Sequence, residues 1–138
     1  MSGPPTPERY EIERRVEPED IDALGHVNNI VYLRWVQDAA VAHWRALATP
    51  EQRAALVWVV VRHEIDYLRP AMPEDVLRVA TWVGGATRKA FERHTEIRRA
   101  SDERVLARAR TQWCPLDAQT LKVADVGHDV RERFSRPA

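Results

Sequence analysis

The segment from Asp20 to Tyr32, D-I-D-A-L-G-H-V-N-N-I-V-Y, contains the side chains best suited to chemistry. Asp20, Asp22 and His26 stand in a glycine-containing loop just before an expected helix. A helix N-terminus presents unpaired N–H groups and about half a positive charge, so it can stabilise a carbonyl oxygen that becomes negative during attack. A carboxylate beside it could attack a carbonyl carbon or activate water. Acidic residues ahead of a helix more often serve only as caps and dipole partners, and the pattern alone leaves both interpretations open.

Other reactive side chains have simpler explanations. We expect His43 and His63 to pack or lie on the surface, and neither His94 nor His128 has a partner at metal-ligand spacing. The single cysteine, Cys114, excludes an intrachain disulfide and a cysteine-clustered zinc site, and we expect it to be a small buried apolar residue. The chain has no G-x-S-x-G elbow, P-loop or G-x-G-x-x-G motif. The sequence therefore predicts neither a metal nor a cofactor.

The loop that carries Asp22 should lie between a strand and a long helix. Residues 9–16 read as a strand, and residues 17–28 as a loop with Pro18 and Gly25. Asn28 or Asn29 can cap a helix over about residues 30–47, where apolar side chains recur at spacings of three and four. This helix is expected to be largely buried.

The rest of the chain alternates between β-rich runs and turn residues. The predicted strands are 57–67, 76–83, 89–99 and 104–114, with a short helix near 51–56 and another over 126–134. Gly84-Gly85 is expected to make a turn, and Pro115 to end the last strand. Because short turns join antiparallel neighbours, these elements predict an α+β fold with one helix on an antiparallel sheet.

Composition limits the class of protein. The 138 residues, 44% hydrophobic and 30% charged, suit a single globular domain over 9–138 behind a flexible tail, 1–8. Equal numbers of basic and acidic residues, 21 each, argue against a nucleic-acid partner. The longest apolar run, residues 54–61, is too short for the ~20 residues that span a bilayer. With no signal-peptide pattern at the start, we expect a cytoplasmic protein without a membrane partner.

Charge is distributed unevenly along the chain. Residues 1–30 hold seven acidic against three basic residues, whereas residues 88–110 hold eight basic against four acidic ones. Such asymmetry can draw two copies together or attract an anionic ligand, and it is equally explained by solvated strand faces in an arginine-rich chain.

The motif D-x-D-x-x-G-H-V-N-N-x-x-Y resembles the signature of the 4-hydroxybenzoyl-CoA thioesterase-like family, an acyl-CoA thioesterase branch of the hotdog-fold superfamily. Two later segments support the resemblance: Y-L-R-P-A-M-P-E-D-V-L over residues 67–77 and T-R-K-A-F over residues 87–91. The resemblance implies a five-stranded antiparallel sheet wrapped around one long central helix, in agreement with the order of elements predicted above.

The resemblance also implies roles for single residues. Asp22 matches the catalytic carboxylate of the family, and the backbone amide that stabilises the oxyanion falls near Asn29. His26 would position or relay, since it matches the histidine of D-x-N-x-H-V-N-N in plant acyl-carrier-protein thioesterases, although Leu24 replaces the asparagine of that pattern. A glutamate common on the family's helix is Gln37 here.

Substrate contacts follow from the same resemblance. Asn28 and Tyr32 would contact the substrate, and Arg88 and Lys89 would hold the phosphates of CoA. The implied reaction is hydrolysis of an acyl-CoA to a carboxylic acid and free CoA, by a homodimer or homotetramer with active sites at the subunit boundary. Two alternatives stay open: a protein that binds acyl thioesters without hydrolysis, and a thioesterase that acts on acyl-carrier protein.

Overall fold

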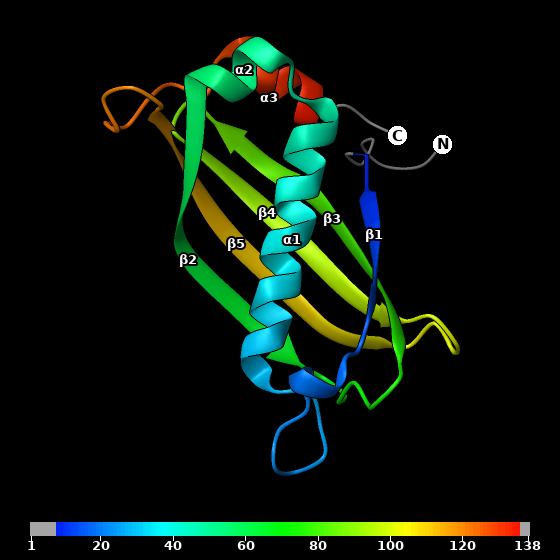
Figure 1. Cartoon of the computed structure of the whole chain (residues 1–138). Coiled ribbons are helices and arrows are strands. Elements are labelled where there is room, and N and C mark those ends of the chain that lie inside the picture. Colours follow the sequence, from blue (N-terminus) through cyan, green and yellow to red (C-terminus); the bar gives the residue numbers. More distant parts are fainter. Residues whose placement is uncertain (1–7, 136–138) are drawn as a thin grey trace, which may run out of the picture.

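The computed structural model describes residues 8–135, which form one antiparallel sheet curved around a long helix (Figure 1). The strands are β1 (Tyr10–Arg15), β2 (Leu56–Tyr67), β3 (Val76–Thr87), β4 (Ala90–Arg99) and β5 (Val105–Asp117), and they pair in the order β1-β3-β4-β5-β2. The helices are α1 (Asn29–Leu47), α2 (Pro50–Ala55) and α3 (His128–Ser135), with a 3₁₀ turn, η1, at Pro18–Asp20. The predicted α+β hotdog architecture is confirmed.

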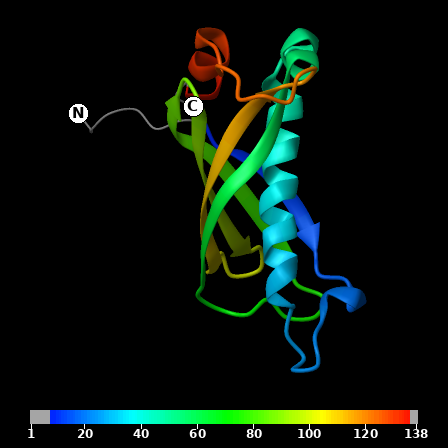
Figure 2. The ribbon, with the colours of Figure 1, turned by 90° about the vertical axis from the view of Figure 1, so that its left-hand side faces the viewer.

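Helix α1 lies along the concave side of the sheet, with α2 and α3 near its C-terminal end (Figure 2). The side chain of Asn28 caps its start by accepting a hydrogen bond from Ile30 N at 3.1 Å. Trp35, Val36 and Ala39 lie on the buried face, which packs mainly against β3 and β1. Burial is one-sided, because Ile30 and Val41 remain exposed within the single chain. The expectation of a largely buried helix is therefore met on one face only.

Strand β3 is longer than predicted, because Gly84-Gly85 is not a turn. The register with β4 shifts at a bulge between Val83 and Gly85, and pairing then continues as far as Thr87, which pairs with Ala90. A Cβ on Gly84 would stand 2.4 Å from the His94 ring, so the glycine allows close approach of the neighbouring strand.

Strand β5 also continues past its predicted end. Pro115 pairs with Trp58 of β2, and β5 ends only at Asp117. Pairing of β5 with β4 stops at Trp113, so Pro115 has a strand on one side only and its missing N–H interrupts no ladder toward β4.

The remaining boundaries differ from the predictions by one or two residues. The C-terminal helix begins at His128 and packs Val130 and Phe134 into a cluster with Phe91. The expected tail, residues 1–8, lies outside the described residues apart from Glu8. Among the helices that the structure describes, none is long and apolar enough to cross a membrane.

Candidate active site

The loop between β1 and α1 is fixed to the helix by a buried carboxylate. Asp20 is 3% exposed, and its two oxygens accept hydrogen bonds from Arg34 Nη2 at 2.7 Å and Glu17 N at 2.9 Å. The Asp20 carbonyl also accepts from Asn28 N at 2.8 Å, which brings the start of the loop to the start of the helix. The first aspartate of D-x-D therefore has a structural role.

The second aspartate lies in a tight hairpin that projects from this base. Ile21 and Val27 form an isolated bridge, and the Asp22 N–H donates to the His26 carbonyl at 2.8 Å. The carboxylate Oδ1 of Asp22 accepts from Leu24 N at 2.9 Å and His26 N at 3.4 Å. Gly25, with φ of 80°, makes the reversal in a conformation that costs other residues strain. Oδ2 of Asp22 makes no hydrogen bond within residues 8–135, so it is free to act on a ligand.

The histidine of the motif contacts Asp22 only through its backbone. The exposed imidazole of His26 has no hydrogen bond to the carboxylate in this part of the chain. A relay between the two side chains would need a different rotamer of His26.

The start of α1 offers the expected donors. Ile30 N donates a hydrogen bond to Asn28 Oδ1. Asn29 N has no acceptor among the described residues, as is usual for the first position of a helix. The Tyr67 hydroxyl donates to the Asn29 carbonyl at 3.3 Å and so ties this turn to the end of β2. Asn29 N is therefore the most available donor for a developing oxyanion.

Tyr32 is placed differently from the other predicted contacts. It is buried in the core, stacks edge-on against Trp35 and Tyr67, and its hydroxyl accepts a hydrogen bond from Ala71 N at 2.8 Å. Burial raises the pKa of this hydroxyl. The hydroxyl is therefore already paired within the core, and the predicted contact of Tyr32 with substrate stays a prediction.

Arg88 and Lys89 form the turn between β3 and β4, at the opposite end of the molecule from the Asp22 loop (Figure 1). Helix α1, which separates them, is 19 residues and about 28 Å long. Arg88 Nε lies 3.0 Å from Asp125 Oδ2, and both cations are exposed. Within one copy of the chain, Asp22 and these two cations therefore lie at opposite ends of α1.

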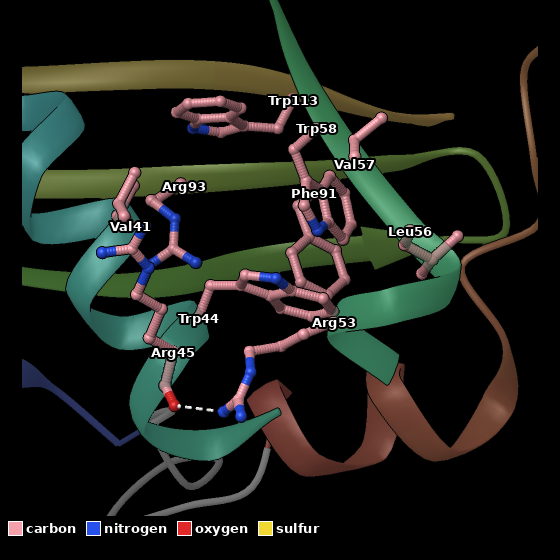
Figure 3. Close-up of a pocket in the computed structure, with 11 residues that line it drawn as sticks. Val41, Trp44, Arg45, Arg53, Leu56, Val57, Trp58, Phe91, Arg93 and Trp113 are labelled. Atoms are coloured by element: carbon pink, nitrogen blue, oxygen red, sulfur yellow. Dashed lines mark hydrogen bonds between the residues drawn. The ribbon is translucent and has the colours of Figure 1, made fainter. Parts of the chain in front are cut away.

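A pocket of about 420 Å³ opens beside the C-terminal half of α1 (Figure 3). Its walls come from α1, α2, β2, β4 and β5. They are formed by Ala40, Val41, Trp44, Arg45, Arg53, Leu56, Val57, Trp58, Phe91, Arg93 and Trp113. The volume is in the range of small-molecule sites.

The pocket contains a buried cation that sequence reasoning did not single out. Arg93 is 3% exposed, and its Nη1 contacts His43 Nδ1 at 2.8 Å and Thr81 Oγ1 at 3.2 Å. Burial lowers the pKa of Arg93 to about 9, and burial together with the Arg93 charge lowers the pKa of His43 to about 3. His43 is therefore neutral at neutral pH and accepts the hydrogen bond. Its predicted role in packing is consistent with this burial.

The strand pattern already held a signal for Arg93. It alternates with Phe91, Thr95 and Ile97, all of which face the core, so an arginine stands where an apolar residue is usual. No comparable signal marks Asp20 and Arg34, whose contact spans 14 residues. Within residues 8–135, no cluster of three or more histidine, cysteine, aspartate or glutamate side chains is arranged to hold a metal.

Comparison with known proteins identifies the family of this chain. The sequence model of the thioesterase-like superfamily matches residues 16–134. The oleoyl-acyl carrier protein thioesterase of Coriandrum sativum is 29% identical over 62% of this chain and 24% of its own length. The long-chain acyl-CoA thioesterase FadM of Escherichia coli (strain K12) is 24% identical over 88% of this chain and 94% of its own. This chain spans about a quarter of the length of the plant relatives that it matches.

A solved structure extends the comparison. A thioesterase of Thermus thermophilus, complexed with coenzyme A and Zn, is 25% identical, with a TM-score of 0.79 over 91% of this chain and 96% of that one.

One antiparallel sheet around a long helix, preceded by the hairpin that carries Asp22, defines a hotdog-fold domain. The superfamily match spans most of the sequence, and the chain belongs to the thioesterase-like superfamily. The predicted family is thereby confirmed. The roles of the single site residues stay predictions.

Proposed function

We propose that this chain hydrolyses acyl-CoA thioesters, with Asp22 as nucleophile or general base and the N-terminus of α1 polarising the thioester carbonyl. The observation that carries the proposal is a carboxylate with one free oxygen, held in a rigid hairpin at the start of a helix whose first N–H is unpaired. The acyl-CoA class is supported by FadM, whose length this chain covers almost completely.

The reaction needs only groups that the loop supplies. As a base, Asp22 takes a proton from water while the water oxygen attacks the carbonyl carbon. As a nucleophile, it forms a mixed anhydride with the acyl group, which water then hydrolyses. In both routes the carbon–sulfur bond breaks, CoA leaves as a thiolate that takes up a proton, and the acid is released. Asn29 N donates to the carbonyl oxygen as its negative charge develops.

The site is proposed to be completed by a second copy of the chain. Strand β2 is an edge of the sheet, and Val57, Val59 and Val61 along it are 39%, 42% and 61% exposed. A long apolar edge of this kind invites pairing with another strand. A dimer through β2 with antiparallel strands would reverse one copy relative to the other, which brings the Arg88–Lys89 turn of one copy toward the Asp22 end of its partner.

Acyl-carrier protein is the second candidate substrate, because a plant relative is named as an oleoyl-acyl carrier protein thioesterase. The same acyl group offered on CoA and on carrier protein distinguishes the two. Faster hydrolysis of the carrier-bound acyl group would identify acyl-carrier protein, instead of CoA, as the preferred carrier.

The replacement Asp22→Asn tests the mechanism. The amide keeps the oxygen that accepts from Leu24 N, so the hairpin should persist, while a nucleophilic or basic carboxylate is lost. We expect turnover of a panel of acyl-CoAs to fall roughly 10²–10⁴-fold with unchanged melting temperature. Glu19→Gln, an exposed carboxylate in the same loop, is the matched control and should keep full activity. Parental activity in folded Asp22→Asn protein would contradict the mechanism.

A further inference from the structure

The polar side-chain atoms of the pocket beside α1 share one property: all of them donate hydrogen bonds. They belong to Arg45, Arg53, Arg93, Trp44, Trp58 and Trp113. Guanidinium and indole N–H groups have no acceptor capacity, and the other lining side chains are apolar. A ligand that satisfies this pocket must bring acceptors, and three cations favour a negative charge.

Arg93 is a buried cation without a counterion. Its two side-chain partners, His43 and Thr81, are neutral, and burial alone accounts for its lowered pKa, with no acid acting against it. No carboxylate of residues 8–135 forms an ion pair with its guanidinium. An unpaired buried charge costs free energy. A bound anion that pairs with Arg93 would lower that cost.

Two indole donors on the same walls are also unsatisfied. Trp58 Nε1 and Trp113 Nε1 are buried and have no hydrogen-bond partner in the described part of the chain. Buried donors of this kind are rare unless a ligand or water satisfies them. Both indoles belong to residues that line the same pocket as Arg93.

The body of the pocket is aromatic. Trp58 stacks on Phe91 with ring centroids 4.7 Å apart, and Trp44 meets Trp58 edge-on at 5.5 Å. Arg45 and Arg93 extend toward the same end of the pocket, and Arg53 is held near the rim by hydrogen bonds to the carbonyls of Arg45 and Ala48 (Figure 3). Flat apolar walls therefore lie between the exposed Arg45 and Arg53 and the buried Arg93.

We propose that this pocket binds an organic carboxylate with a flat, ring-sized apolar body, whose carboxylate pairs with Arg93. A carboxylate only accepts hydrogen bonds and carries a single charge, which suits one buried guanidinium between aromatic walls. A phosphate has no apolar body to contact the aromatic walls, and the exposed Arg45 and Arg53 are the cations that it would meet first. Within the chain the site lies at the C-terminal half of α1, away from Asp22, and binding of a free carboxylate can be measured there without any thioester hydrolysis.

The test is calorimetric titration of the full chain at neutral pH with cinnamate, with cinnamamide as the uncharged probe of the same shape, and with inorganic phosphate. We expect one cinnamate per chain, bound at least about tenfold more tightly than the amide, as a charge-assisted hydrogen bond would give. Phosphate should not compete. This comparison uses the unaltered protein, so it stands even where a variant fails to fold.

Variants locate the site. Arg93→Met keeps the volume and should remove the preference for cinnamate over cinnamamide, while Arg78→Met, which removes an exposed arginine paired with Glu103, should leave it intact. Equal affinity for the two probes, absence of binding, or displacement by phosphate would each overturn the proposal. Absence of binding would be the expected result if an acidic side chain of a second copy occupied Arg93 instead.

Discussion

Substitution of Asp20 should lower the stability of the protein, whereas substitution of Asp22 should lower its activity. Asp20→Asn removes one of the two acceptor oxygens of a carboxylate that is 3% exposed and turns an amide N–H₂ toward a donor. Loss of a hydrogen bond to a charged group costs about 1.5–3 kcal/mol. The larger penalty of about 3–5 kcal/mol for breaking a buried ion pair does not apply in full, because the Arg34 side chain is 57% exposed and regains water.

We therefore expect Asp20→Asn to lower the free energy of unfolding by about 2 kcal/mol, or the melting temperature by roughly 6–10 °C for a chain of this size. Asp38→Asn is the matched control. Its partner, Arg14, lies 3.3 Å away and both side chains are more than a third exposed, so the loss should stay below about 1 kcal/mol.

Thermal and urea unfolding followed by circular dichroism, with thiol release on the same samples, measures both effects. Asp20→Asn should unfold earlier and keep much of its turnover at a temperature where it is folded, the reverse of Asp22→Asn. If Asp20→Asn melts at the parental temperature, the ion pair to Arg34 does not hold the loop and the reasoning is refuted.

Four further outcomes are expected. Gly25→Ala strains a residue with φ of 80° and should cost about 1 kcal/mol in a melting experiment, with reduced turnover because the Asp22 hairpin is displaced. Val59→Lys charges the exposed edge of β2 and should shift the assembly toward monomers in light scattering, whereas an unchanged mass would place the interface elsewhere. Arg88→Ala with Lys89→Ala should raise KM for acyl-CoA more than it lowers kcat, and an equal defect on an N-acetylcysteamine thioester, which lacks phosphates, would exclude phosphate binding. Burial by itself would raise the pKa of Glu96, but hydrogen bonds from Arg98 and Arg108 hold this pKa below the usual value. The charged Glu96 therefore stabilises the fold above about pH 4.5, and this stabilisation is lost on acidification. Melting temperatures of Glu96→Gln and of the parent should converge at low pH.

Sequence was sufficient where a signal is local. Asn28 caps α1 because its side chain reaches an N–H two residues away. Gly25 allows the chain to reverse because glycine adopts a positive φ without strain. Such features depend on residues within a few positions of each other, and these the chain order specifies directly.

Strand ends needed the neighbouring strands. Gly84 was predicted to be a turn and lies inside β3, where it makes room for His94, and Pro115 lies inside β5. Both residues commonly end strands, but the outcome depends on which strand is alongside and on which edge. That information comes from pairing between distant segments.

The features that depend most on tertiary structure lie at the two ends of α1. The D-x-D motif alone does not distinguish the roles of its two aspartates. In the folded chain, Arg34 pairs with Asp20, whereas Asp22 keeps one oxygen without a hydrogen bond among the described residues. Sequence order likewise does not reveal that Arg88 lies far from Asp22, or that Arg93 meets neutral partners and three tryptophans in one pocket. The chain itself determined the fold class, the helix and the reactive loop through local periodicity and turn chemistry. Which charges are paired, buried or left free was decided only when segments distant in sequence packed together, since the energy of a charge depends on the surroundings that folding gives it.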